Sequence, residues 1–559
     1  MAPVTTAPAD PEVDGENGVI DVRKAARLAE ADEAGAAGGR ERRLRARLIG
    51  RPPSDLVLGW LGPIAAAVIG GVLRFWNLGN PHQLVFDETY YVKEGWSMIL
   101  FGVEMRNNPS LDAAKQIDQN FTAGNVRTVY DPTVGDLVVH PPVGKWLIGW
   151  GEHLFGITNS FGWRFSVCVM GTLSILMLGR IARRLFHSSF LGTVAAILLA
   201  FEGHHFVHSR TGLLDLIVMF WALAGFGFLL IDRDASRAVL ARRVAALPRD
   251  RLGRFGPAMG WRPYRGAAGL CLGLSTGTKW SGLYFVIAFG LMSVLWDMGA
   301  RRAAGIPGWR TAWLVKDSPF AFIAIVGTTV VTYCLSWWGW FVSSDGYNRH
   351  WADTHGSTRW GWIPGSVRSW WNYHAQILDF HEHLVSDHPY KTNPWSWLIQ
   401  GRPTSFFYEG PKKGVDGCTV EICSKAITSI GTPSIWWGAT LAIVVLLFMW
   451  ALRRDWRAGA ILAGFVGGYL PWFALEERTI YSFYVVAFVP WVVLACVYVL
   501  GLFLGGPNAS RGRRRVGMGI TGGFVVLTVL LFAFFYPLYT AQVVPQDFWR
   551  AHMWFPSWV

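Results

Sequence analysis

Charged residues are scarce in this sequence. Asp, Glu, Lys and Arg make up 16% of the 559 residues, whereas about a quarter is usual in a soluble protein. Hydrophobic residues make up 52% of the chain. This balance excludes an ordinary soluble domain and predicts an all-α polytopic membrane protein.

Cysteine is also rare. The six cysteines are too few for a disulfide scaffold. Only Cys418 and Cys423 share a polar loop, so one small bridge is open to this pair if the loop faces an oxidising compartment. The first residues are polar and lack a basic stretch leading into an apolar core, so no cleavable signal peptide is expected.

Motifs of soluble nucleotide chemistry are missing. The sequence has no Walker loop, no dinucleotide glycine pattern and no nucleophile elbow, so neither a nucleotide donor nor a nucleotide cofactor is expected. Two histidine clusters lack the His-Glu-x-x-His spacing of zinc hydrolases, so a divalent metal is not indicated. They comprise His204, His205 and His208, and His381, His383 and His388.

The formal charge of +13 does not point to a nucleic acid partner, because the basic residues cluster in short connections between apolar segments. The run RERRLRARLIGR (40–51) precedes the first apolar segment and predicts a cytoplasmic N-terminus. The connections predicted on the same side are 232–264, 299–317, 453–457 and 511–515.

Apolar segments predict about eleven transmembrane helices, at roughly 20 residues for each crossing. They cover 56–76, 162–181, 189–207, 212–231, 265–278, 281–297, 319–341, 434–452, 457–474, 480–504 and 517–537. This odd number places the C-terminus on the extracytoplasmic side, with external loops at 77–161 and 342–433. The short apolar segment 140–155 is expected to lie at the interface rather than to cross.

Carboxylates and cations gather on the predicted external face. Asp87 and Glu88 follow the first span, inside the aromatic run LVFDETYYVKEGW (84–96). Other polar residues predicted there are His140, Lys145, Arg164, Arg210, Asp215, Lys279 and Arg478. Charges at membrane depth are costly and usually mark a pathway or a site. Cations around a carboxylate pair suit a reaction in which a lipid phosphate leaves while an aspartate deprotonates an acceptor hydroxyl.

These residues also have structural interpretations. Four cations suit interface anchors that extend to the headgroups, namely Arg164, Arg210, Lys279 and Arg478. Asp215 lies about one turn past Arg210, so the two suit an ion pair. His140, which precedes two prolines, suits a stiff turn that opens the interfacial helix.

Eight motifs occur in order along the chain. They are FDE (86–88), HPPVGK (140–145), WRFSVCVMGTL (163–173), SRTGLLD (209–215), TKWSGLY (278–284), HPYKTNPWSWL (388–398), GTPSIWWG (431–438) and ERTIYSFY (477–484). Each motif is weak alone. Their joint order over residues 56–540 resembles the protein O-mannosyltransferase family.

The resemblance implies a GT-C glycosyltransferase fold with its active site in the first external loop. It also implies inverting transfer of mannose from a polyprenyl-phosphate-mannose lipid donor to Ser or Thr hydroxyls of secreted polypeptides. Carried over by position, Asp87 is the expected catalytic base and Glu88 its acceptor-side companion. The expected substrate-binding residues are His140, Arg164, Arg210, Lys279 and Arg478. Lys279 and Arg478 are the expected phosphate contacts.

The family also implies a place in the cell and a domain plan. Eukaryotic members carry a β-trefoil domain in the second external loop, and 343–433 is too short for one, so the chain resembles the bacterial form. The implied location is a bacterial plasma membrane, with an extracytoplasmic active site and the Sec translocon as a partner. The expected regions are a disordered, basic cytoplasmic tail (1–55), a catalytic transmembrane region (56–342), the loop 343–433, and a C-terminal transmembrane region (434–559).

Three other functions stay open at this point. A related transferase that places aminoarabinose or another sugar on a lipid is hard to distinguish from residues alone. An oligosaccharyltransferase is disfavoured, because its WWDYG signature is only echoed by WWNYH (370–374), with Asn372 at the acidic position. A transporter is disfavoured because the charges gather at one face rather than near the midplane, and no repeated halves are evident.

Overall fold

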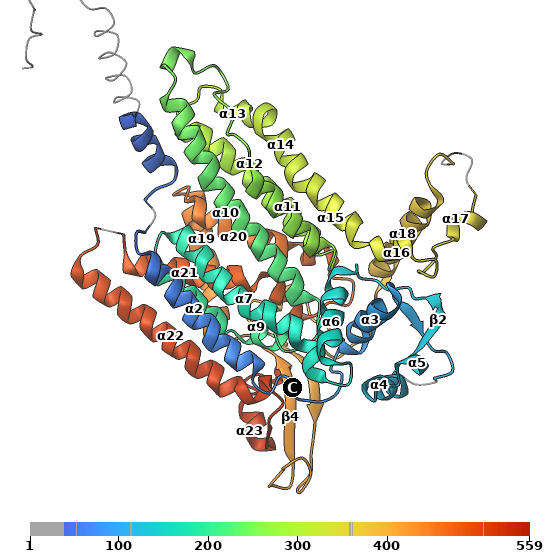
Figure 1. Ribbon diagram of the computed structural model, residues 1–559. Coiled ribbons are helices and arrows are strands. Elements are labelled where there is room, and N and C mark those ends of the chain that lie inside the picture. Colours follow the sequence, from blue (N-terminus) through green and yellow to red (C-terminus); the bar gives the residue numbers. More distant parts are fainter. Residues whose placement is uncertain (1–37, 52, 112–113, 357–358, 360, 507) are drawn as a thin grey trace, which may run out of the picture.

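The computed structural model describes residues 38–51, 53–111, 114–356, 359, 361–506 and 508–559. It is a bundle of long helices with short helices and strands gathered at one end (Figure 1). Helices dominate because a backbone inside lipid has to satisfy its hydrogen bonds within its own segment. The helical membrane fold predicted from composition is confirmed.

In the part of the chain that the structure describes, nine helices are long and apolar enough to span a membrane. They are α2 (Leu56–Phe75), α7 (Ser160–Phe186), α10 (Asp215–Ala245), α12 (Gly282–Ala303), the continuous α13 to α15 (Trp309–Ser336), α19 (Pro433–Ala451), α20 with η5 (Trp456–Leu475), η6 with α21 (Ser482–Leu504), and α22 (Arg511–Tyr539). All nine coincide with predicted spans.

The other two predicted spans are short helices, so a count of eleven full spans is not confirmed. α8 (Ser189–Ala200) has 12 residues and α11 (Pro263–Thr276) has 14. α8 stops early because the Glu202 side chain accepts hydrogen bonds from two backbone N–H groups of the next helix, α9 (Gly203–His208). This cap starts a new helix inside the apolar run 189–207.

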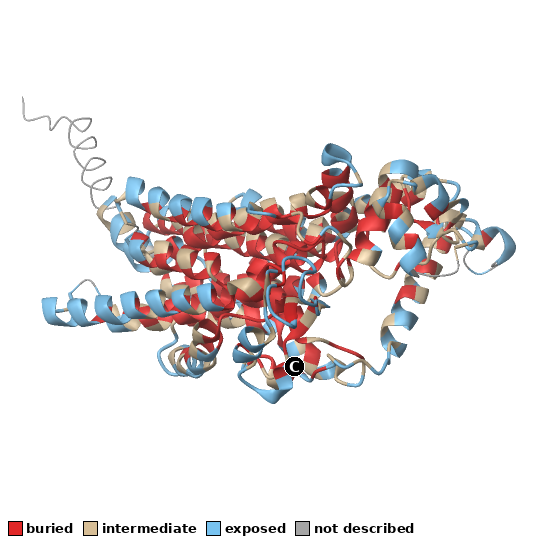
Figure 2. Cartoon of the chain, turned by 90° about the horizontal axis from the view of Figure 1, so that it is seen from below, coloured by how far each residue is buried: buried red, intermediate tan, exposed pale blue. Residues whose placement is uncertain are grey.

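The outer faces of the bundle are apolar. On α2, Leu61, Val68 and Val72 are each more than half exposed, whereas small residues such as Ala66 and Gly70 face inward. Figure 2 shows the same division, with exposed positions on the outside of the helices and buried positions within. Exposed apolar rows on long helices are the surface that lipid covers.

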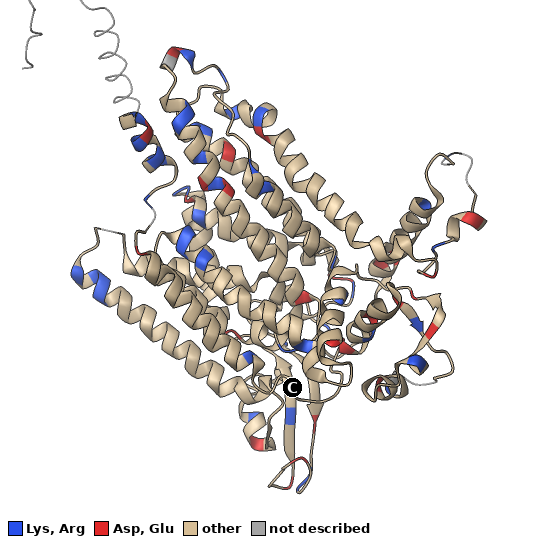
Figure 3. Ribbon diagram, in the orientation of Figure 1, with Lys and Arg blue, Asp and Glu red and all other residues tan. Residues whose placement is uncertain are grey.

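Charged residues gather at the ends of the bundle (Figure 3). At the end distant from α3, a buried network of four residues ties α10 to α11 and α12. Arg262 and Arg265 each contact both Asp232 and Asp297. Two arginines shared between two carboxylates leave none of these buried charges unpaired, which is the condition for tolerating such groups away from water.

The first predicted loop is folded around two helices. α3 (Glu88–Phe101) packs on α6 (Val143–Phe155), which has 13 residues and is too short to span. A Cβ on Gly149 would lie 2.4 Å from the carbonyl oxygen of Gly95, so glycine is what allows this close approach. The same region contains β1 (Met105–Asn107), α4 (Ala114–Thr122), α5 (Val126–Val129) and β2 (Tyr130–Gly135).

The second predicted loop contributes helices and a sheet at the same end. Its elements are α17 (Trp351–Thr354), α18 (Gly365–His383), β3 (Thr404–Glu409) and β4 (Cys423–Ser429). β5 (Val543–Pro545) pairs antiparallel with the other edge of β4. Cys418 and Cys423 form a disulfide beside this hairpin. The remaining short elements are η1 (Arg249–Arg251), α16 (Trp338–Val342), η4 (Pro394–Ser396), α23 (Gln546–Ala551) and η7 (Pro556–Trp558).

The predicted N-terminal tail falls mostly outside the described residues. Residues 1–37 are not described, and the basic segment 38–48 is helical. The predicted division of the chain into a catalytic and a C-terminal region stays a prediction.

Candidate active site

Asp87 stands at the N-terminus of α3 but does not cap it. An Asp at this position ordinarily accepts a hydrogen bond from the first turn of its helix, whereas the Asp87 side chain makes no such bond. The preceding residue, Phe86, has φ 51°, in the left-handed region. For a bulky residue this costs on the order of 1–2 kcal/mol, and strain of this kind tends to occur at functional sites.

Aromatic contacts hold Phe86 in this conformation. Its ring stacks on Phe406 with centroids 4.6 Å apart and meets Phe483 edge-on at 5.2 Å. Phe406 belongs to β3 and Phe483 to η6, so residues distant in the sequence fix the turn that presents Asp87.

Asp87 lines a cavity of about 1090 Å³, here called the catalytic cavity. Six segments form its walls: the start of α3, the end of β1, residues 136–140 before α6, residues 279–284, the end of α18, and residues 472–484. This volume is large enough for a sugar together with a short stretch of peptide. Four of the predicted site residues line it, namely Asp87, His140, Lys279 and Arg478.

The surroundings of Asp87 set its protonation. The pKa of Asp87 is raised to about 6, chiefly by burial; Lys279 and a hydrogen bond from Tyr91 oppose the rise, and the Asp215 carboxylate contributes to it. A carboxyl with a pKa near 6 is ionised at neutral pH and is a stronger base than an exposed aspartate.

Glu88 points away from the catalytic cavity into a buried ion pair. Its two carboxylate oxygens accept hydrogen bonds from Nε and Nη2 of Arg164, each at 2.8 Å. They also accept from the backbone N–H groups of Val85 at 3.0 Å and Gly212 at 2.8 Å. Arg164 donates further to carbonyl oxygens of the turn before α3. The pair therefore fixes the turn that carries Asp87.

Lys279 enters the cavity paired with Asp215. Its Nζ lies 3.0 and 3.2 Å from the two carboxylate oxygens of Asp215, and 4.7 Å from the ring centroid of Tyr484. The expected pairing of Asp215 with Arg210 is therefore wrong, because a residue 64 positions away supplies the cation.

Arg210 lies outside the catalytic cavity. Its guanidinium donates to the carbonyl oxygens of Arg74 at 2.6 Å, Trp76 at 2.7 Å and Asn77 at 3.0 Å, which are the last carbonyls of α2 and the turn after it. A cation at a helix C-terminus satisfies carbonyls that have no partner within the helix. This position favours the structural interpretation of Arg210.

Arg478 and His140 bring unused polar atoms into the cavity. Arg478 Nε and His140 Nδ1 are buried, and neither has a hydrogen-bond partner among the described residues. Burial and the neighbouring Lys279 hold the pKa of His140 well below its usual value, so the ring is neutral. A neutral imidazole and a guanidinium with a spare N–H suit the hydroxyls and phosphate of a bound glycolipid.

A second carboxyl, Glu94, lies in the same cavity. Lys145, which the sequence placed on this face, contacts Glu104 at 2.5 Å and Glu94 at 3.6 Å. The pKa of Glu94 is raised to about 7, because the effect of burial outweighs the opposing effect of Lys145. The Lys145 ammonium is fully buried, so it serves this carboxylate pair rather than the substrate.

Sequence reasoning did not assign Glu94 or His381 to the site, although both line the cavity. A signal existed for Glu94, because it follows Asp87 by seven residues, which is the spacing of one helix face. His381 had no such signal. Its ring stacks on His140 with centroids 5.3 Å apart, across 241 residues of sequence.

The other histidines do not form a metal site. Among the described residues, no group of three or more His, Cys, Asp or Glu side chains is arranged to hold a metal ion. His204, His205 and His208 are buried in α9, where they hydrogen bond to protein groups. His383 is exposed and lies beside Asp379.

Comparison with known proteins covers most of the chain. Residues 64–242 match a family described as dolichyl-phosphate-mannose-protein mannosyltransferase. Residues 366–558 match the C-terminal four-transmembrane region of protein O-mannosyltransferase. The two matches together include Asp87, Glu88, Arg164 and Arg478.

Similar curated proteins are named polyprenol-phosphate-mannose--protein mannosyltransferase. One from Mycolicibacterium smegmatis is 36% identical over 90% of this chain and 94% of its own length. One from Mycobacterium tuberculosis is 35% identical over 90% of this chain and 93% of its own length. A solved Saccharomyces cerevisiae protein O-mannosyltransferase complex bound to the sugar donor has a similar fold, with a TM-score of 0.64 and 15% identity over 91% of this chain and 95% of that chain.

Proposed function

Because the chain belongs to the protein O-mannosyltransferase family, we propose that Asp87 is the base with which it transfers mannose from a polyprenyl-phosphate-mannose donor to protein hydroxyls. The chain is a protein O-mannosyltransferase. The family resemblance stated from eight sequence motifs is thereby confirmed. The names of the relatives give a protein acceptor, which favours this function over transfer to a lipid and over transport.

The reaction exchanges one bond at the sugar for another. The acceptor hydroxyl oxygen of Ser or Thr forms a bond to the anomeric carbon of mannose, on the face opposite the phosphate, and the bond from that carbon to the phosphate oxygen breaks. Asp87 accepts the hydroxyl proton, and polyprenyl phosphate leaves with the bonding electron pair. Attack from the opposite face inverts the configuration at the sugar.

Two cations are placed to stabilise the leaving phosphate. Lys279 and Arg478 line the catalytic cavity together with Asp87. Nε of Arg478 has no hydrogen-bond partner in the described part of the chain, and an added phosphate oxygen would satisfy it. Lys279 is held by Asp215, so its position is defined before the donor binds. Cations fixed where negative charge develops are an effective form of catalysis.

Glu88 has a positioning role in this proposal rather than contact with the acceptor. Both of its oxygens are engaged by Arg164 and by backbone N–H groups. The pair joins the turn before α3 to the first turn of α7, which holds Asp87 at the edge of the cavity.

The catalytic cavity is proposed to face the extracytoplasmic side of a bacterial plasma membrane. The basic connections lie at the other end of the bundle, where the positive-inside rule places the cytoplasm. Secreted polypeptides would then reach the cavity as they leave the Sec translocon, which we propose as a neighbour of this enzyme.

One observation supports the base assignment most strongly, namely an Asp87 carboxyl that leaves its helix uncapped and lines a large cavity beside two cations. The test is transfer of labelled mannose from polyprenyl-phosphate mannose to a Ser/Thr-rich peptide in membranes. Asp87→Asn is expected to lower the rate by about 10²–10⁴-fold, the usual contribution of a general base.

Asp118→Asn is the matched control. Asp118 pairs with Lys93 on the same helix α3 but does not line the catalytic cavity. The control is expected to keep near wild-type transfer. If Asp87→Asn transfers mannose as fast as the control, at equal membrane content, then another residue is the base.

A further inference from the structure

A second cavity, of about 1100 Å³, lies at the end of the bundle opposite Asp87. α7 connects the two ends, because Arg164 in its first turns contacts Glu88, whereas its last residue, Phe186, lines the second cavity. At 1.5 Å per residue, that stretch of helix is roughly 33 Å long. The second cavity, here called the basic cavity, is therefore separate from the catalytic one.

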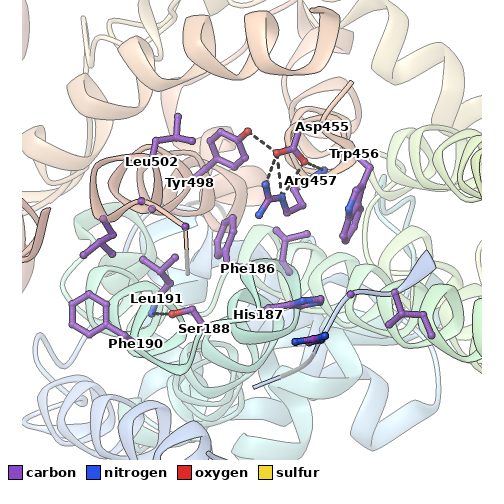
Figure 4. Close-up of a pocket in the computed structure, with 18 of the residues that line it drawn as sticks. Phe186, His187, Ser188, Phe190, Leu191, Asp455, Trp456, Arg457, Tyr498 and Leu502 are labelled. Carbon is purple, nitrogen blue, oxygen red and sulfur yellow. Dashed lines mark hydrogen bonds and ion pairs between the residues drawn. The ribbon is translucent and has the colours of Figure 1, made fainter. Parts of the chain in front are cut away.

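Six parts of the chain surround the basic cavity. They are the segment 46–51, the junction of α7 and α8, α10 through Arg233 and Arg237, the start of α20, the end of α21 and the start of α22. Figure 4 shows side chains around the cavity, among them Phe186, His187, Trp456 and Tyr498. A ligand bound here would contact several of these segments at once.

The charge of the basic cavity is one-sided. Seven arginines line it, namely Arg47, Arg51, Arg233, Arg237, Arg457, Arg513 and Arg514. Asp455 is the only acid among the described lining residues. It is already neutralised, because Arg457 contacts it at 2.6 Å and the Tyr498 hydroxyl donates to it at 2.9 Å (Figure 4).

Two of these arginines donate hydrogen bonds to backbone carbonyls, which are neutral, so the positive charge of each arginine remains. Arg237 is buried and donates to the carbonyl oxygens of Leu48 at 2.8 Å and Trp296 at 3.1 Å. Arg513 donates to the carbonyl oxygen of Leu502 at 2.9 Å. Hydrogen bonds to carbonyls orient a guanidinium without cancelling its charge, and unneutralised buried charge is costly.

Arg233 provides independent evidence that the cavity suits an anionic ligand. Its side chain is 3% exposed, and its guanidinium lies 3.4 Å from the ring centroid of Trp456. Nε of this buried side chain has no hydrogen-bond partner among the described residues. The neighbouring carboxylate, Asp234, also pairs with Arg184, so it neutralises the charge of Arg233 only in part.

Apolar residues at the rim indicate what the ligand carries. Phe190 and Met518 line the cavity and are 45% and 56% exposed, on the outer surface of the bundle that lipid covers. A ligand with an anionic head and an apolar tail satisfies both the arginines and this rim. Arginine forks match the geometry of phosphate oxygens. We propose that the basic cavity binds the phosphate headgroup of an anionic membrane lipid.

The test measures lipid retention by the full-length protein. Wild type and variants are reconstituted in nanodiscs of phosphatidylcholine, with and without phosphatidylglycerol, and the bound lipids are counted by native mass spectrometry after release. The double variant Arg47→Gln/Arg513→Gln removes two exposed lining charges. Arg242→Gln is the matched control, because Arg242 is exposed at the same end of the bundle but does not line the cavity.

The expected result is retention of phosphatidylglycerol by the wild type and by Arg242→Gln, and at least roughly tenfold weaker retention by the double variant. Equal unfolding midpoints in phosphatidylcholine alone show that both variants are folded. Equal phosphatidylglycerol retention by all three proteins overturns the proposal. Displacement of phosphatidylglycerol by inorganic phosphate at matched ionic strength also overturns the lipid assignment, because it makes a soluble phosphate the ligand.

Discussion

Glu88 and Arg164 form a bidentate ion pair, with both nitrogen-to-oxygen distances at 2.8 Å, directly beside the candidate base Asp87. The side chains of both residues are almost fully buried. The two adjacent carboxylates thus have different surroundings. Asp87 lines the catalytic cavity, whereas Glu88 forms an ion pair with Arg164 of α7. In this arrangement one acid is free to act as the base, and its neighbour holds the backbone that carries the base.

Glu88→Gln is expected to destabilise the protein by about 3–5 kcal/mol, because it leaves the Arg164 guanidinium buried without a counter-charge. The measurement is the thermal unfolding midpoint of the purified protein in detergent. Asp118→Asn breaks the pair between Lys93, which is 8% exposed, and Asp118, which is 29% exposed, and is expected to cost less than Glu88→Gln, because water reaches one partner of this pair. If the two substitutions lower the unfolding midpoint equally, the Glu88–Arg164 pair does not have a special role in stabilising the turn before α3.

The sequence predicted the fold through patterns that depend only on local composition. The nine long helices found among the described residues follow from the length of apolar segments. The early end of α8 could not be predicted this way, because it depends on one side chain, Glu202, which turns back to cap α9. Hydropathy averaged over about 20 residues does not detect a helix end that depends on a single side chain.

The candidate site was predicted in part. Asp87, His140, Lys279 and Arg478 do meet in one cavity. The partner of Asp215 was wrong, because Arg210 is near in sequence while Lys279 is near in space. Arg210 instead closes the end of α2. Ion pairing across 64 residues depends on how α10 and α11 pack, which a single sequence does not express.

The transfer rate is expected to rise with pH through about 6 and then level off, because the base is active when deprotonated and burial raises the pKa of Asp87 to about 6. At one pH unit below this value, kcat/KM should be about tenfold below its plateau. The measurement is kcat/KM for peptide mannosylation at constant ionic strength. A profile that is flat down to about pH 5 would show that no group of this pKa is essential.

The variant Glu94→Gln tests whether Asp87 or Glu94 is the base. Glu94 is the nearest alternative, because its pKa is raised to about 7. If Asp87 is the base, kcat/KM of this variant should still rise with pH near pH 6. The cavity histidines do not titrate in this window, since burial lowers the pKa of His381 to about 4 and that of His140 well below its usual value. Loss of the limb in Glu94→Gln would transfer the role of base to Glu94.

Lys279 and Asp215 are expected to shift this pH profile in opposite directions. Lys279 lowers the pKa of Asp87 and Asp215 raises it. Lys279→Gln should therefore move the rising limb to higher pH, and Asp215→Asn should move it to lower pH. The readout is the apparent pKa of kcat/KM in each variant. Shifts of the same sign in both would show that the limb belongs to a group other than Asp87.

Disturbing the packing of α3 on α6 is expected to lower both the rate of mannose transfer and the stability of the protein. A Cβ on Gly149 would lie 2.4 Å from the Gly95 carbonyl oxygen, so Gly149→Ala must separate α3 from α6, and we expect the shift to displace Asp87 at the start of α3. Overpacking of this kind costs about 1–3 kcal/mol.

Gly290→Ala is the matched control for that substitution. Gly290 lies inside α12, and no atom stands within 4 Å of its added Cβ. Helix propensity alone should then stabilise the protein, by up to about 1 kcal/mol. Unfolding midpoints and mannose transfer are measured for both variants. If Gly149→Ala behaves like Gly290→Ala in both measurements, α3 does not depend on its contact with α6 for its position, and the Glu88–Arg164 pair and the aromatic contacts of Phe86 are sufficient to hold Asp87.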